Sequence, residues 1–220
     1  MHEVSKTLSP GKKIGLFLAF AFAGIGAAIW FAGPPPSGQS QAASDILVTP
    51  RPLPAFTLTR ADHAPLTRED LRGKWSLMFF GYTHCPDVCP TTLAELAQAR
   101  QLLAADSKVL AETQFVFVSV DPARDSPESL RDYVHYFAAD FIGATGSPQQ
   151  LATITQALDI KHSRGEAGAD GYVVNHSSAV LLIDPQVRYY ARLKAPHYGD
   201  EVRQHYLAIR DHYYETQRTP

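Results

Sequence analysis

The chain has 220 residues, of which 45% are hydrophobic and 19% are charged. These fractions exclude a wholly disordered chain and indicate one globular domain with some additional length. A formal net charge of −2 gives no reason to expect nucleic acid as a partner. Two cysteines, Cys85 and Cys89, are too few for a disulfide-stapled scaffold or a four-cysteine zinc site.

The N-terminal region predicts a membrane anchor. Residues 14–33 are all apolar or glycine, and this run has about the length that a helix needs to cross a bilayer. Lysines precede the run, so we expect residues 1–13 to stay in the cytoplasm. The sequence therefore predicts a single-pass protein of the inner (cytoplasmic) membrane, with its soluble domain on the periplasmic side. A cleaved signal peptide is the alternative, although its apolar core is usually shorter.

The remaining chain predicts a linker and one folded domain. Residues 34–50 are rich in Pro, Ser, Gln, Ala and Gly, which is typical of a linker. Residues 51–215 then form a domain of strands alternating with helices, which indicates an α/β sandwich with crossover connections. The apolar runs predict strands at 56–58, 75–80, 115–120, 179–183 and 187–193. Capped or amphipathic segments predict helices at 91–105, 126–137, 148–158 and 200–214. Between them, the polar residues 161–176 predict a long functional loop or a hairpin insertion.

The two cysteines lie in the segment GYTHCPDVCPTT, between a buried strand and a helix. Backbone N–H groups at a helix N-terminus stabilise anions, so we expect lowered thiol pKa values here. If the turn is helical, the four-residue spacing places both sulfurs on one side. Such a pair can bind a soft metal or form a disulfide, but a purely structural disulfide across so short a loop would add little stability. Asp87, between the cysteines, is a candidate helix cap, or alternatively contacts the metal site or a partner.

Two thiolates need a further metal ligand, and nine histidines are available. His176 is the strongest candidate, because it lies between the polar insertion and an apolar strand, where its imidazole could reach the thiols. His84 is a weaker candidate, since it adjoins Cys85 and neighbouring side chains on an extended strand end point in opposite directions. The other histidines of the domain lie in polar stretches and are typical surface residues.

Three segments together carry a family resemblance: GYTHCPDVCPTTLAEL at 81–96, VFVSVDPARDSPESLRDYV at 116–134 and VNHSSAVLLIDP at 174–185. They resemble the SCO/SenC/PrrC family of copper-binding cytochrome c oxidase assembly proteins. The resemblance implies a thioredoxin-like fold with a central mixed sheet, preceded by one transmembrane helix. It also implies that Cys85, Cys89 and His176 bind copper, as Cu(I), Cu(II) or both.

The resemblance further implies partners. The expected client is cytochrome c oxidase subunit II, which would receive copper for its binuclear centre or have its cysteines reduced before loading. Other copper chaperones or thioredoxin-like proteins are further expected partners. Thiolates favour Cu(I) and imidazole accepts copper, so the chemistry of the three residues agrees with this reading.

Some positions near the expected site are open to more than one interpretation. The family usually has Asp before the metal-binding His, whereas this chain has Asn175. An amide can hydrogen-bond but adds no charge, so we expect copper binding to persist with an altered affinity or oxidation-state preference. Asp121, Arg124 and Asp125 follow a buried strand, and they form either a local turn network or a docking surface near the site.

Two alternatives to a copper chaperone remain open. A thiol–disulfide oxidoreductase would use Cys85 and Cys89 without His176, although C-x-x-x-C is one residue longer than the usual redox motif. A copper or redox sensor would report the state of the same site to another membrane protein. Apart from thiol–disulfide reduction, the sequence predicts no enzymatic activity.

Overall fold

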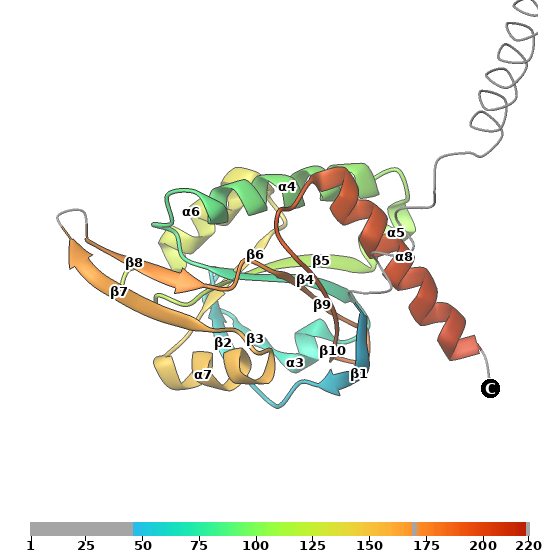
Figure 1. Ribbon diagram of the computed structural model, residues 1–220, viewed down its shortest axis with the longest axis horizontal. Coiled ribbons are helices and arrows are strands. Elements are labelled where there is room, and N and C mark those ends of the chain that lie inside the picture. Colours follow the sequence, from blue (N-terminus) through green and yellow to red (C-terminus); the bar gives the residue numbers. More distant parts are fainter. Residues whose placement is uncertain (1–45, 169–170, 219–220) are drawn as a thin grey trace, which may run out of the picture. The chain divides into compact units, whose positions relative to one another are not determined.

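The structure is a computed structural model that describes residues 46–168 and 171–218. Within these residues the chain forms an eight-stranded mixed sheet, a separate two-stranded sheet, and helices on both faces of the larger sheet (Figure 1). The strands are β1 Ile46–Pro52, β2 Thr57–Arg60, β3 Pro65–Thr67, β4 Trp75–Gly81, β5 Thr113–Ser119, β6 Ile142–Thr145, β7 His162–Gly168, β8 Gly171–His176, β9 Val180–Ile183 and β10 Arg188–Leu193. The helices are α3 Arg68–Leu71, α4 Val88–Leu103, α5 Ser107–Ala111, α6 Pro127–Phe137, α7 Pro148–Ala157 and α8 Gly199–Arg218.

The centre of the large sheet is its most buried part. Its strand order is β1-β10-β9-β4-β5-β6-β2-β3, in which β4, β5 and β6 are parallel and the remaining pairs are antiparallel. Every residue of β4 is buried, because neighbouring strands cover its edges and helices cover its faces. The register places Gly81 opposite Ser119, so β4 and β5 end at the same edge of the sheet. The predicted α/β arrangement with crossover connections is confirmed.

Helices cover both faces of this sheet. In Figure 1, α4 and α6 lie over one face, whereas α3 and α7 lie under the other. The predicted Ser caps are present at α6 and α7, where Ser126 and Ser147 each accept a backbone N–H bond from the first turn. Helix α8 packs against α4, and Glu95 of α4 accepts a 2.6 Å hydrogen bond from the backbone N–H of Gly199, the first residue of α8.

Strands β7 and β8 form a hairpin of their own, which confirms the hairpin alternative for residues 161–176 (Figure 1). Its register pairs His162 with His176, so the beginning and the end of the hairpin are neighbours. The next contact also joins the two ends, because the N–H of Ser177 donates a 3.2 Å hydrogen bond to the carbonyl of Lys161.

The structure differs from the sequence predictions at the margins. Strand β1 begins at Ile46, inside the last five residues of the predicted linker, and it pairs with β10. Strands β3 and β6 and the short helices α3 and α5 were not predicted, because each has five residues or fewer and too little sequence to display a period. The predicted cytoplasmic N-terminus (1–13) and membrane helix (14–33) lie outside the described residues. Across 46–168 and 171–218, none of the helices combines the length and apolarity that crossing a bilayer requires.

Candidate metal centre

Cys85, Cys89 and His176 come together at one edge of the large sheet. The two sulfur atoms and one nitrogen of His176 all lie within 4.8 Å of one another. Within the part of the chain that the structure describes, this is the only group of three Cys, His, Asp or Glu side chains close enough to share a metal ion. The His84 ring is not part of it, as the alternation of side chains at the strand end predicted.

The cysteines lie where β4 ends and α4 begins. Cys89 is in the first turn of α4 and is fully buried, whereas Cys85 precedes the helix and keeps 9% of its surface exposed. The backbone N–H of Cys89 points at the Cys85 sulfur, at 3.4 Å. Asp87 occupies the N-cap position but makes no side-chain capping bond, so its predicted capping role is wrong. The Cys85 sulfur instead accepts a hydrogen bond from one of the N–H groups of the first turn that have no partner within the helix.

His176 is held in the orientation that a metal ligand needs. Its Nδ1 lies 3.0 Å from the carbonyl oxygen of Ser177, and its Nε2 lies 3.2 Å from the Cys89 sulfur. Because a carbonyl can only accept, Nδ1 carries the proton and Nε2 keeps its lone pair toward the sulfur. The rings of Phe79 and Tyr82 meet the imidazole edge-on, with centroids 6.0 and 5.9 Å away.

Burial controls the charge of these groups. Burial raises the pKa of the Cys89 thiol well above its usual range, and the nearby Cys85 adds to the rise. The predicted lowering by the helix N-terminus is therefore wrong for Cys89, because desolvation of the thiolate outweighs it. Burial also lowers the pKa of His176, although its bond to the Ser177 carbonyl works in the opposite direction. The metal-free site thus holds a protonated Cys89 thiol that donates to a neutral imidazole.

Gly81, the last residue of β4, gives the Cys89 sulfur its space. A Cβ atom at this position would lie 2.6 Å from the Cys89 sulfur and 2.9 Å from the Phe117 ring. Both distances are shorter than van der Waals contact, so any other residue would displace the sulfur or the ring. Gly81 was not predicted to have a role in the site, although a glycine at the end of a buried strand can indicate that another group approaches the backbone closely.

Asp125 fixes the loop that leads to Cys85. Its carboxylate is 1% exposed and accepts hydrogen bonds from the backbone N–H of Thr83 at 2.9 Å and from the Thr83 hydroxyl at 2.6 Å. The hydroxyl of Ser119 donates a third bond, at 2.5 Å. His84 lies on the solvent side of this group, with Nδ1 3.0 Å from the Thr83 hydroxyl. These bonds join the ends of β4 and β5 directly beneath the cysteine loop.

Asp121 and Arg124 form a network that reaches the hairpin. Arg124 donates a 2.5 Å bond to the Asp121 carboxylate, and Tyr172 of β8 donates a 2.7 Å bond to the same carboxylate. The Tyr172 ring lies between two guanidinium groups, with Arg124 3.7 Å and Arg164 4.0 Å from its centroid. Asp121 and Arg124 thus belong to a turn network that fastens the hairpin, and with it His176, to the loop after β5.

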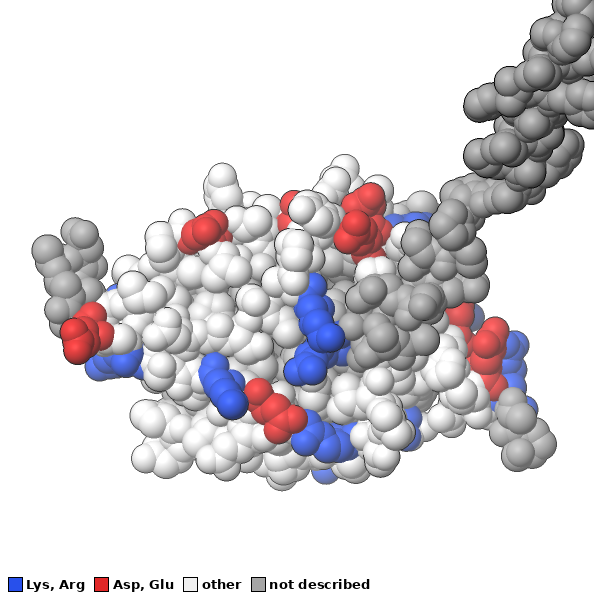
Figure 2. Space-filling model, in the orientation of Figure 1, with Lys and Arg blue, Asp and Glu red and all other residues white. Residues whose placement is uncertain are grey.

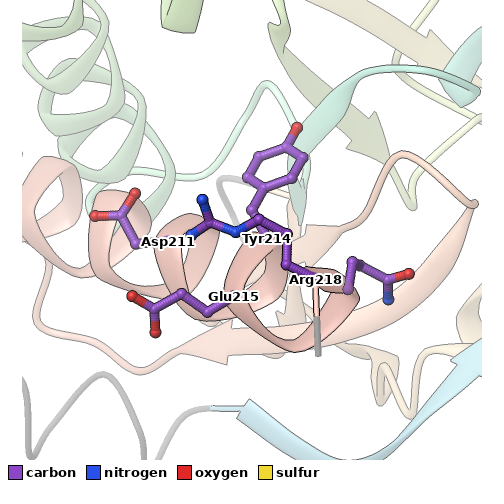
Figure 3. Close-up of a pocket in the computed structure, with 5 residues that line it drawn as sticks. Asp211, Tyr214, Glu215 and Arg218 are labelled. Carbon is purple, nitrogen blue, oxygen red and sulfur yellow. The ribbon is translucent and has the colours of Figure 1, made fainter. Parts of the chain in front are cut away.

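Asn175 lies apart from the donor atoms. Its side chain is exposed and makes no hydrogen bond with the described residues, and it lines a surface hollow beside His176. The Ser177 carbonyl, and not Asn175, orients the imidazole. A second hollow lies at the end of α8, lined by Asp211, Tyr214, Glu215, Gln217 and Arg218 (Figure 3). All of its lining residues come from one helix and none is a candidate ligand, so it has no part in this site.

The donor set selects a class of metal. Two sulfur atoms and one imidazole nitrogen suit soft or borderline ions such as Cu(I), and carboxylate-binding ions such as Mg²⁺ or Ca²⁺ find no oxygen ligand among the three. The 3.2 Å between the Cys89 sulfur and His176 Nε2 is close to the spacing of about 3.5 Å expected for two atoms bound to one ion. Three ligands leave one side of the ion open, in contrast to a closed four-ligand structural site.

The chain is similar in sequence to proteins of one known family. The sequence profile of the SCO1/SenC family matches residues 48–209. A protein of Stutzerimonas stutzeri is 35% identical over 155 residues, covering 70% of this chain and 75% of that protein. The mitochondrial SCO2 homologue of Homo sapiens is 39% identical over 148 residues, covering 65% of this chain. This match spans only 55% of the human protein's length.

Solved structures show the same architecture. The crystal structure of Arabidopsis thaliana ScoI with copper bound matches with a TM-score of 0.68 and 32% identity, covering 73% of this chain and 98% of that one. Bradyrhizobium japonicum ScoI with copper bound matches with a TM-score of 0.64 and 27% identity, over 73% of this chain and 98% of that one. The described domain has the thioredoxin-like fold with a mixed central sheet.

Proposed function

This chain belongs to the SCO1/SenC family, and we propose that it is a copper chaperone that binds the ion through Cys85, Cys89 and His176 and serves the assembly of cytochrome c oxidase. The observation that carries the proposal is the clustering of two sulfur atoms and one imidazole nitrogen within 4.8 Å. Copper-bound relatives of the same fold support the choice of metal.

Loading of Cu(I) is an exchange of protons for metal. Cys89 is a thiol before binding, because burial raises its pKa, so the incoming ion displaces its proton to solvent as the copper–sulfur bond forms. His176 needs to lose no proton, since burial favours its neutral form. With both cysteines as thiolates, the loaded centre carries a net charge of −1 for Cu(I) and is neutral for Cu(II).

Transfer of the ion proceeds from the exposed side of the site. Cys89 is buried, whereas Cys85 and His176 keep some exposed surface. An acceptor's ligand atom therefore approaches past Cys85 and His176, and the ion leaves as these bonds exchange one at a time. Cys89 is the last ligand to release it.

A copper titration tests the proposal. Reduced full-length chain is expected to bind one Cu(I), and Cys85→Ser, Cys89→Ser and His176→Ala are each expected to weaken binding by at least about 100-fold, because each removes a ligand. His135→Ala, which changes an exposed histidine on α6, is the matched control and is expected to bind normally. Unchanged affinity of His176→Ala would remove that residue from the ligand set.

The client in this proposal is cytochrome c oxidase subunit II. The test is transfer of Cu(I) from the loaded chain to the separately purified copper domain of subunit II, measured as the copper content of that domain after the two proteins are separated. Transfer is expected from the wild-type chain and not from copper-loaded small thiols at equal copper concentration. Equal transfer from both donors would argue against a chaperone role.

The location belongs to the same proposal. Lysines before residues 14–33 support a single membrane helix with the folded domain on the periplasmic side of the inner membrane. In spheroplasts, added protease is expected to digest the folded domain without lysis of the cell. Protection of the domain until lysis would reverse the orientation.

A second function, thiol–disulfide exchange, is favoured by the closeness of the two sulfur atoms. Cys85, the more exposed, would attack a partner disulfide, and Cys89 would then displace the partner's second thiol and close a Cys85–Cys89 disulfide. Two electrons pass to the partner, so an external thiol reductant must restore the pair. This activity is expected to survive His176→Ala, which separates it from copper binding.

A further inference from the structure

A surface hollow of about 540 Å³ opens beside His176. It lies where the paired ends of the hairpin meet β10, and its wall includes Lys161, Asn175 and Arg192 in addition to His176. A candidate metal ligand therefore forms part of the wall of an open depression large enough for a short peptide segment.

The hollow has an excess of positive charge. Lys161 and Arg192 are exposed, and neither forms an ion pair with a carboxylate of the described residues. The one acidic side chain of the wall, Asp159, is engaged by Arg51 at 2.5 Å. An adjoining hollow shares Asp159 and Arg192 and adds Lys194.

This charge stands out on a chain whose net charge is −2. Figure 2 shows Lys and Arg side chains in blue gathered over the region of β10 and the beginning of β7, with a smaller red area among them. A partner that approaches the exposed side of His176 thus meets positive charge, although the chain as a whole is slightly acidic.

We propose that this hollow binds an acidic segment of the protein that exchanges copper with this chain. The inference rests on the proposed function, because the partner is the one whose ligand atoms meet the ion at His176. Exchange requires those atoms to come within about 2.0–2.3 Å of the metal, so a partner must be held next to its ligands. Carboxylates on a segment lying in the hollow would pair with Lys161 and Arg192 and hold it there.

The chemistry favours a protein segment over other anions. The hollow is open and its cationic groups stand on long flexible stems, which suits carboxylates spaced along a chain and lacks the enclosed donors of a site for a small anion. The slight negative charge of the whole chain opposes a polyanion such as nucleic acid. Pairs of this kind are weak singly and sensitive to salt, which suits a transient partner.

Peptide binding tests the proposal without requiring copper. Fluorescein-labelled hexaglutamate and hexaglutamine peptides are titrated with reduced, copper-free full-length chain in neutral detergent, and anisotropy is followed at low and high salt. Hexaglutamate is expected to bind at low salt and to be released at high salt, and hexaglutamine is expected not to bind. The double variant Lys161→Glu/Arg192→Glu is expected to bind hexaglutamate at least about tenfold more weakly.

The control reverses the same number of positive charges at a place outside the hollow. Lys74→Glu/Lys108→Glu changes two exposed lysines, on the segment before β4 and on α5, and is expected to bind hexaglutamate like the wild type. Equal affinities of the two double variants, or binding of hexaglutamine as tight as that of hexaglutamate, would overturn the proposal. Copper titration of the same variants separates the two claims. If the two double variants bind hexaglutamate equally while the chain still binds copper, only the docking surface is overturned. If their hexaglutamate affinities differ but the chain binds no copper, only the proposed function is overturned.

Discussion

The Cys89 sulfur lies 3.2 Å from Nε2 of His176, although 87 residues separate them in the chain. One atom belongs to the first turn of α4 and the other to the last residue of β8. Their distance is therefore set by how the hairpin is fastened to the large sheet. The carboxylate of Asp121 fastens the hairpin, because it accepts hydrogen bonds from the hydroxyl of Tyr172 in the hairpin and from the guanidinium of Arg124 in the turn after β5.

Tyr172→Phe is expected to loosen the hairpin while preserving the ring between Arg124 and Arg164. Loss of one hydrogen bond to a buried carboxylate costs about 1 kcal/mol. Amide hydrogen exchange in 162–176 is then expected to accelerate about fivefold, and copper affinity to fall by less than tenfold. Tyr136→Phe, at a residue that is 84% exposed, is the control and is expected to change neither quantity.

Gly81→Ala is expected to disturb the metal centre through packing alone. The added Cβ would approach the Cys89 sulfur to 2.6 Å, so the sulfur must move away from His176 or the strand must shift. We expect a loss of about 1–3 kcal/mol in the free energy of unfolding of the metal-free chain, together with weaker copper binding. Gly143→Ala is the comparison, since its nearest atoms are 3.4 Å away. Equal losses in both variants would mean that the cysteine has room to adjust.

The two thiols are expected to react at different rates. Cys85 is 9% exposed, whereas Cys89 is fully buried and burial raises its pKa, so little of it is thiolate. Iodoacetamide is expected to modify Cys85 at least about ten times faster than Cys89 in the reduced, copper-free chain. Mass spectrometry of the separated peptides measures both rates, and prior addition of one equivalent of Cu(I) is expected to protect both residues. Faster modification of Cys89 would contradict the burial argument.

The stability of the metal-free chain is expected to fall in mild acid. Burial lowers the pKa of His197 from its ordinary value of 6.5, although its contact with the Ser178 carbonyl opposes the shift. The folded state therefore favours the neutral ring. Its contribution to stability is complete above pH 6.5 and is lost as the pH falls from there toward the lowered folded-state pKa. His176 acts in the same direction.

Denaturant unfolding at a series of pH values measures this effect. His197→Gln keeps a hydrogen-bond donor for the Ser178 carbonyl but cannot titrate, so its stability is expected to depend less steeply on pH below 6.5 than that of the wild type. The difference in slope is limited to about 1.4 kcal/mol per pH unit for one proton. The exposed His212→Gln is the control, and a slope change as large as that of His197→Gln would contradict the assignment.

Much of the fold could be predicted from the sequence because the central strands are continuous apolar runs. Trp75–Gly81 is buried along its whole length, and such a run permits few other interpretations. Ile142–Thr145 lies in the same sheet, separated from β4 by β5, and was missed. Its sequence, IGAT, has no pattern of its own and forms a strand by pairing with β5. The linker boundary was misplaced for the same reason, because β1 depends on β10 for its bonds.

The candidate site also contains residues that could be predicted from sequence and others that could not. The cysteines and His176 carry chemistry that the sequence displays, and they were identified as candidates. Asp125 was predicted to lie near the site, but its bonds to Thr83, 42 residues earlier in the chain, could not be inferred from sequence. Tyr172 was not predicted at all, because it contacts Asp121 only after the hairpin has folded back onto the domain. The effect of burial on Cys89 was also invisible, because the helix N-terminus could be inferred from sequence but the depth of the sulfur could not.

The meeting of Lys161 and Ser177 at the base of the hairpin has a consequence for how such a protein arises and can be altered. Residues 162–176 leave and re-enter the domain at almost the same point, and none of the eight strands of the large sheet passes through them. The third candidate ligand, His176, thus belongs to a hairpin that is inserted between two neighbouring points of the domain. A parent domain with only the two thiols could gain metal affinity by acquiring this one segment. In protein design, the segment could be shortened, exchanged or transplanted without changing the strand order of the large sheet.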